Sequence, residues 1–109
     1  MSNYTGWDIG GAHIKVANVN SIGKVLYVEE YAAPIWEGLS VLEDKLYYIK
    51  DNLPTNSLYH GITMTAELAD IFKSKQDGVM RLIELCCKIL GENTFFYSTI
   101  DGLNKINNI

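Results

Sequence analysis

An acidic residue, two glycines and a lysine lie within eight residues of one another near the start of the chain. The stretch reads DIGGAHIK, from Asp8 to Lys15, and an apolar run follows it. Carboxylate oxygens suit hard cations such as Mg²⁺, and glycine lets a ligand approach the backbone. Backbone N–H groups and a lysine ammonium suit phosphate oxygens. These residue types indicate a site that binds a diphosphate together with its metal ion.

Each polar residue of this loop has a role in the diphosphate interpretation. Asp8 would hold Mg²⁺, directly or through water. The N–H groups of Gly10 and Gly11 would point at the anion, and Lys15 would reach a phosphate oxygen. His13 could donate to a phosphate or titrate near neutrality, or simply face solvent. The alternative for the whole stretch is a β-hairpin with a glycine turn, because a lone glycine-rich loop is a weak motif.

The hydrophobic pattern predicts the elements that must position this loop. Apolar and β-branched stretches predict three strands joined as an antiparallel meander. Apolar residues then recur at spacings of three and four, which predicts a helix. A fourth strand, a helical segment broken near Gln76 to Gly78, and a fifth strand follow. The strands are expected over Tyr4 to Asp8, Ala12 to Asn20, Lys24 to Pro34, Leu58 to Thr65 and 93–100, the helices over Leu39 to Leu53 and Ala66 to Gly91, and 101–109 as a further helix or a frayed end.

The composition limits the classes of protein to which this chain can belong. It has 109 residues, of which 48% are hydrophobic, and a net charge of −4. This length predicts one domain, and the negative charge argues against a nucleic-acid partner. No apolar run is long enough to span a membrane, and the N-terminus lacks the pattern of a secretory signal. The adjacent Cys86 and Cys87 cannot readily pair, so a reducing, cytoplasmic location with both thiols on a helix is expected.

Two further stretches contain candidate site residues. TMTAELAD places Thr65 and Glu67 after the fourth predicted strand, at the start of a helix. Helix capping and the helix dipole are sufficient to explain residues of these types there, and a position at the edge of a cleft is the functional alternative. In PIWEGL, Trp36 either packs the first helix onto the sheet, which we favour, or stacks on an aromatic ligand. His60 is expected to be structural.

The element order βββαβαβ and the DIGGAHIK loop resemble the first lobe of the actin-like superfamily, which includes sugar kinases and heat-shock chaperones. More narrowly, GWDIGGAHIKVANV, PIWEGL, ITMTAELADIF and DGV resemble the methanofuran-biosynthesis synthase family, also called tetrahydromethanopterin-linked C1 transfer pathway proteins. This resemblance implies an α/β, ribonuclease H-like lobe with a five-stranded mixed sheet of order 3-2-1-4-5, in which strand two is antiparallel. Residues 1–109 would form one such domain, the N-terminal lobe of a longer two-lobed protein.

The resemblance also implies an activity, which belongs to the methanofuran pathway of one-carbon metabolism. The family joins a furan-methyl diphosphate to the phenol oxygen of a glutamylated tyramine and releases pyrophosphate. The loop would then hold the leaving diphosphate and Mg²⁺, Thr65 would line the cleft, and Glu67 would be the base for the phenol. Family members have a second lobe, so catalysis by this chain is expected to need a homo-oligomer or another subunit. An ATP-dependent kinase or ATPase lobe and a non-catalytic dimerising domain are the alternatives.

Overall fold

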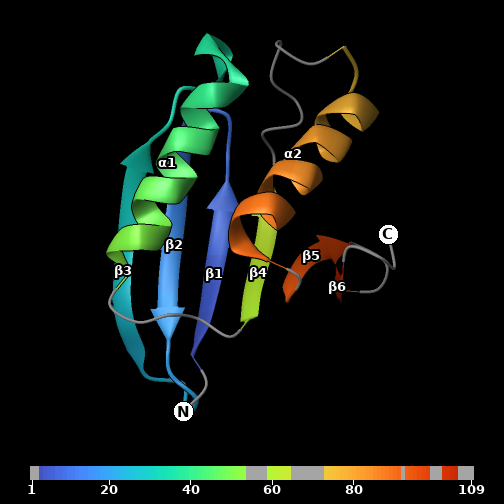
Figure 1. The fold of residues 1–109 in the computed structure, drawn as a ribbon. Helices are drawn as coiled ribbons and strands as arrows, with labels where there is room; N and C mark the ends of the chain where they lie inside the picture. Colours follow the sequence, from blue (N-terminus) through green and yellow to red (C-terminus); the bar gives the residue numbers. More distant parts are fainter. Residues whose placement is uncertain (1–2, 54–58, 65–72, 92, 99–101, 106–109) are drawn as a thin grey trace.

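The computed structural model describes residues 3–53, 59–64, 73–91, 93–98 and 102–105. They form one six-stranded sheet with two α-helices on one of its faces (Figure 1). The strand order is β3-β2-β1-β4-β5-β6. The elements are β1 (Tyr4–Ile9), β2 (His13–Val19), β3 (Val25–Ala32), the short 3-10 helix η1 (Ile35–Glu37), α1 (Leu39–Asn52), β4 (Tyr59–Met64), α2 (Lys75–Leu90), β5 (Thr94–Ser98) and β6 (Gly102–Lys105).

The strand pairing confirms the predicted sheet. β2 lies between β1 and β3 and is antiparallel to both. β4 pairs in parallel with β1, and β5 pairs in parallel with β4. The five-strand order 3-2-1-4-5, with strand two antiparallel, is therefore the one that the sequence predicts. Because β1 is central, the end of β1 and the β1–β2 turn lie beside the end of β4.

Two local predictions differ from the structure. The polar segment after β5 was expected to be helical or frayed, but Gly102–Lys105 forms β6, antiparallel to β5. Its residues have weak strand propensity, so the unpaired edge of β5 supplies the reason for pairing. The predicted break near Gln76 to Gly78 is also wrong, because α2 runs without interruption over these residues. Gly78 lies in the first turn of α2, where its N–H donates to the carbonyl of Ser74 at 3.0 Å.

The core lies between the helices and one face of the sheet. In β1, Thr5, Trp7 and Ile9 are buried, and the residues that alternate with them are exposed. β2 alternates in the same way, because successive side chains of a strand point to opposite faces. The buried residues of α1 that face the sheet are Leu42, Leu46 and Ile49. The other face of β1 and β2, which carries Asp8 and Lys15, is covered by neither helix. Among the described residues, no helix is long and apolar enough to cross a membrane.

Candidate functional site

The β1–β2 hairpin brings Asp8 and Lys15 together. The two residues are directly opposite each other in the register of the pair, and both are exposed on the uncovered face of the sheet. The turn between the strands is closed by the N–H of Gly10, which donates to the carbonyl of His13 at 3.0 Å. The spacing of seven residues from Asp8 to Lys15 is thus the spacing at which a short turn places an acid and a base side by side.

The residues after β3 anchor the glycine turn. The N–H of Ile35 donates to the carbonyl of Gly11 at 3.1 Å, and the N–H of Ala33 donates to the carbonyl of Ala12 at 2.7 Å. Ile35 is buried, and its Cγ2 would lie 3.9 Å from a Cβ built on Gly11. The 3-10 helix η1 therefore supports the glycine turn on its buried side. The opposite side of the turn is the one that a ligand could reach.

A cavity of about 340 Å³ opens at this turn. It brings together the five residues of the loop that were predicted from the sequence to bind a diphosphate or its metal. One acid, one base, an imidazole and a stretch of bare backbone thus share one surface, as an anion with a bound cation requires. The lining residues are Asp8, Gly10, Gly11, Ala12, His13, Lys15 and Glu30.

The backbone donors of this cavity differ from those expected. The N–H of Gly10 is engaged in closing the hairpin. Within the described part of the chain, the N–H groups of Gly11 and Ala12 donate to no acceptor. The amides that could meet an anion are therefore those of Gly11 and Ala12, together with the ammonium of Lys15. Gly10 contributes the absence of a side chain.

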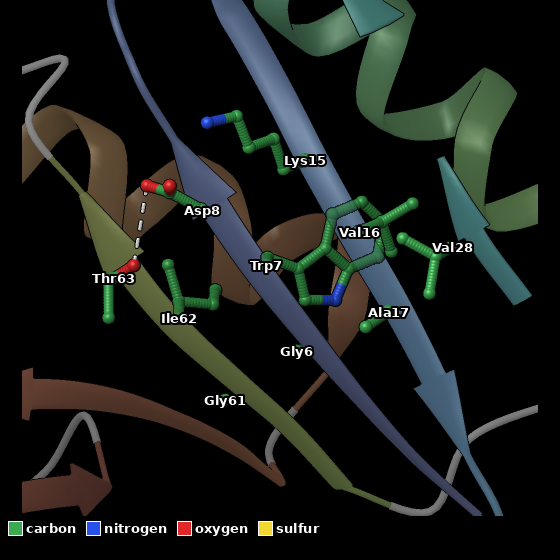
Figure 2. A pocket seen from close by; sticks show the side chains of 10 residues that line it. All are labelled: Gly6, Trp7, Asp8, Lys15, Val16, Ala17, Val28, Gly61, Ile62 and Thr63. Carbon is green, nitrogen blue, oxygen red and sulfur yellow. Dashed lines mark hydrogen bonds between the residues drawn. The ribbon is translucent and has the colours of Figure 1, made fainter. Parts of the chain in front are cut away.

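Asp8 lies beside a hydroxyl on the neighbouring strand. The Thr63 Oγ1 donates to Asp8 Oδ1 at 3.4 Å, because Asp8 and Thr63 are opposite each other in the parallel β1–β4 pair (Figure 2). No group of three or more His, Cys, Asp or Glu side chains gathers as metal ligands among the described residues. A single exposed carboxylate does fit Mg²⁺, which commonly keeps several waters and takes its other ligands from phosphate oxygens.

Glu30 is a residue of the cavity that sequence reasoning missed. It lies opposite Lys15 in the β2–β3 pair, and its Oε2 lies 4.0 Å from the Lys15 Nζ. Both side chains are exposed, so the ion pair is weak. A regular hairpin with its turn at Ser21 to Gly23 would pair Lys15 with Glu29. The irregularity between Asn18 and Val19 shifts the register by one residue, so the sequence pattern alone does not place Glu30 beside Lys15.

The remaining candidates divide into three groups. Thr65 and Glu67 lie outside the described residues. Trp36 is 60% exposed, so the interpretation in which it packs the first helix onto the sheet is wrong. His60 is 5% exposed, and its Nδ1 accepts a hydrogen bond from the Trp7 Nε1 at 3.0 Å, as expected of a structural histidine. Burial, with a smaller effect of the Lys50 charge, lowers the pKa of His60 to about 4.

The cysteines carry no reactive thiolate. Cys86 is fully buried in α2, and burial, with a smaller effect of Cys87, raises the pKa of its thiol to about 12. The half-buried Cys87 also has a raised pKa, because of burial. Thiolate is the nucleophilic form of cysteine, so neither thiol is a candidate nucleophile.

Comparison with known proteins gives one relative in sequence. The chain matches no family model. It is 37% identical over 79 residues to a synthase of Methanocaldococcus jannaschii, named for a furan-2-yl-methanamine product that carries a gamma-L-glutamylaminoethyl-phenoxymethyl group. The match covers 72% of this chain and 22% of the synthase, so the chain spans well under half the length of the relative that it matches.

Two solved structures share the fold. The RuvC structure from T. thermophilus, in complex with a Holliday junction substrate, has a TM-score of 0.57 at 9% identity, and the match covers 92% of this chain and 66% of that chain. An exopolyphosphatase from Cytophaga hutchinsonii has a TM-score of 0.52 at 15% identity, and the match covers 87% of this chain and 34% of that chain. The topology and these likenesses together show that the chain has an α/β, ribonuclease H-like fold.

Proposed function

We propose that this chain is the diphosphate- and metal-binding lobe of a transferase that makes an aryl ether in methanofuran biosynthesis. The substrate class is a furan-methyl diphosphate, and the acceptor is the phenol of a tyramine-glutamate. The observation that carries the proposal is the shared cavity of Asp8, Gly11, His13 and Lys15 at the end of the central strand. The sequence relative, whose name contains the phenoxymethyl-furan ether, supports the reaction class.

The proposed reaction is a substitution at the furan methylene carbon. The bond between that carbon and a diphosphate oxygen breaks, and the electron pair leaves with pyrophosphate. The phenol oxygen forms the new carbon–oxygen bond and loses its proton to a base, for which Glu67 remains the candidate. Negative charge grows on the diphosphate as the bond breaks. Groups that meet this charge only as it develops accelerate the step.

The cavity offers the groups that such a leaving group needs. The amides of Gly11 and Ala12 and the ammonium of Lys15 would bind phosphate oxygens, and His13 would add a further donor. Asp8 would hold Mg²⁺, which would neutralise part of the diphosphate charge. Thr63 would orient the carboxylate of Asp8 through its hydroxyl. The chain spans a small part of its relative, so a second lobe, from another copy or another subunit, would complete the site.

An ATP-dependent kinase or ATPase lobe is the second candidate function. The same cavity would then hold the terminal phosphates of a nucleotide, since the exposed loop contains nothing selective for a furan. One of the structural neighbours is an exopolyphosphatase, which favours phosphate handling by this fold without choosing a substrate. The two functions differ in the ligand that the loop prefers.

Calorimetric titration of pyrophosphate with Mg²⁺ into the chain tests the proposed function. Lys15→Met and Asp8→Asn each remove one charge from the cavity, and Lys24→Met and Asp44→Asn are matched changes at exposed positions outside it. We expect each cavity variant to weaken binding about tenfold or more, equal to about 1.4 kcal/mol, and the controls to leave it unchanged.

Three results would decide between the candidates. The first result is pyrophosphate binding that requires Mg²⁺ and is weakened by the substitutions at Asp8 and Lys15 but not by those at Lys24 and Asp44. This result supports the transferase lobe. Tighter binding of ATP than of pyrophosphate at the same residues moves the assignment to the kinase or ATPase lobe. If the cavity variants and the control variants bind pyrophosphate and ATP equally weakly, both functions are contradicted for this chain.

A further inference from the structure

One face of the sheet lies opposite the two helices and carries exposed apolar side chains. Its side chains come from alternate residues of five adjacent strands, and we call it the open face. Val28 is 66% exposed there, and the stacked rings of Tyr4 and Tyr59 lie 5.7 Å apart, also exposed. A contiguous apolar patch on a monomer commonly marks an interaction site. The open face consists of Tyr4, Gly6 and Asp8 of β1, Lys15 and Ala17 of β2, Val28 and Glu30 of β3, Tyr59, Gly61 and Thr63 of β4, and Phe95 of β5.

Three small residues lie next to one another on adjacent strands in the middle of the open face. Gly6 of β1 pairs with Ala17 of β2 on one side and with Gly61 of β4 on the other. They form the floor of a groove of about 480 Å³, bordered by Val28 at the β3 end and by Asp8, Lys15 and Thr63 toward the glycine turn (Figure 2). Backbone is therefore the surface that a partner would meet at the centre of the sheet.

Nothing in the described fold requires glycine at position 6. A Cβ built on Gly6 would meet no atom within 4 Å, and the backbone there is ordinary strand. Glycine inside a strand costs roughly 0.5–1 kcal/mol relative to alanine. It often marks a place where another backbone or a ligand approaches closely. The pairing of Gly6 with Gly61 on the same face thus indicates close approach by a surface other than the described residues.

We infer that the open face is the interface of a two-fold dimer of this chain. A two-fold interface uses one patch twice, so that patch must carry both projections and hollows. The open face has both, since Val28 projects beside the groove floored by Gly6 and Gly61. It also carries charges of both signs, with Lys15 between Asp8 and Glu30 along one row of the sheet. Charges in this order can meet their opposites on a second copy.

The size of the open face predicts a weak dimer. Five adjacent strands about 4.8 Å apart and about six residues long cover roughly 19 by 20 Å. Two such faces bury roughly 760 Å² before side-chain relief is counted, which is below the area of specific, stable interfaces and in the range of weak ones. Face-to-face sheets pack about 10 Å apart. The row of Asp8 and Lys15 borders the contact, so the glycine turns of both copies stay at its rim.

The test is the mass of the chain in solution, measured by analytical ultracentrifugation from low micromolar to millimolar concentration. Gly6→Val adds a branched side chain to the groove at a position where a built Cβ meets no atom within 4 Å, and Val28→Glu places a charge on the projecting side chain. Ile22→Glu is the matched control, because Ile22 is 82% exposed in the β2–β3 turn, away from the open face. Circular dichroism of each variant verifies the fold.

We expect a monomer–dimer equilibrium whose dissociation constant rises at least about tenfold in Gly6→Val and in Val28→Glu, and is unchanged in Ile22→Glu. Gly6→Val makes the face more apolar, so a merely adhesive patch would associate more strongly in this variant, and that result overturns the inference. Assembly beyond the dimer also overturns it. A monomer over the whole concentration range overturns it too, and would assign the open face to another polypeptide.

Discussion

Lys15 lies between two acidic residues in the register of the sheet. Asp8 is its partner across the β1–β2 pair, and Glu30 is its partner across the β2–β3 pair, with Glu30 Oε2 4.0 Å from Lys15 Nζ. All three groups line the cavity at the glycine turn. A phosphate bound as we propose would therefore compete with Glu30 for Lys15 and would also be repelled by that carboxylate. We therefore expect Glu30 to weaken the binding of an anion.

Glu30→Gln is expected to strengthen the binding of pyrophosphate. The exposed Lys15–Glu30 pair is worth up to about 1 kcal/mol, so the gain should be about twofold to fivefold, and it should shrink as salt is added. Titration calorimetry at low and high ionic strength measures it. Glu29→Gln is the matched control, because Glu29 is also exposed but alternates to the other face of β3. Equal gains in both variants would show a general effect of net charge.

The burial of His60 predicts how stability depends on pH. The pKa of His60 is lowered to about 4 in the fold, from 6.5. As pH falls from about 6.5 to 4, the unfolded chain gains a proton at His60 and the native chain does not, so the free energy of unfolding decreases. The decrease is roughly 2–3 kcal/mol, and it ends near pH 4, where both states are protonated.

Urea unfolding at a series of pH values measures this dependence. His60→Gln removes the titrating group and should flatten the part of the curve between pH 6.5 and 4, relative to the unmodified chain. His13→Gln is the control, since His13 is exposed at the cavity and is the other histidine of the chain. A slope in His60→Gln that equals that of His13→Gln would contradict the role of burial at His60.

Ser74 begins α2 by capping it. Its Oγ accepts a hydrogen bond from the N–H of Asp77 at 3.1 Å. Ser74→Ala should lower the free energy of unfolding by about 1 kcal/mol, and Ser74→Asp should retain it. Ser40→Ala in the first turn of α1 is the control, because α1 follows Gly38 without a side-chain cap, and it should change stability by less than about 0.5 kcal/mol. Equal losses at the two serines in urea unfolding would refute the cap.

The regular elements could be predicted from the sequence because their patterns are local. Alternating apolar residues in β1 and β2, and the three-and-four spacing from Leu39 onward, depend only on which side chains face one core. The glycine turn could also be predicted, because a short hairpin pairs Asp8 with Lys15. The features that the sequence did not reveal depend on residues that are far apart in the chain. β6 forms because β5 offers an edge, and the open face is evident only once Gly6 and Gly61 are seen to pair.

Ile35 and Trp36 are neighbours with opposite environments, and their variants should differ accordingly. Ile35 is buried beneath Gly11, whereas Trp36 is exposed. We expect Ile35→Ala to cost about 2–4 kcal/mol of stability and Trp36→Ala less than about 0.5 kcal/mol. Equal costs in urea unfolding would show that Trp36 packs in solution after all.

Ile35 should matter for the loop as well as for stability, because its N–H and its side chain both contact Gly11. Ile35→Ala should therefore weaken pyrophosphate binding about threefold to tenfold under conditions where the variant remains folded, as expected when a binding loop loses its support. Ile49→Ala is the matched control, because Ile49 is fully buried on α1, away from the cavity. It should lose similar stability and keep its affinity. If Ile49→Ala weakens binding as much, the effect reflects the stability of the whole lobe, and η1 has no specific hold on the turn.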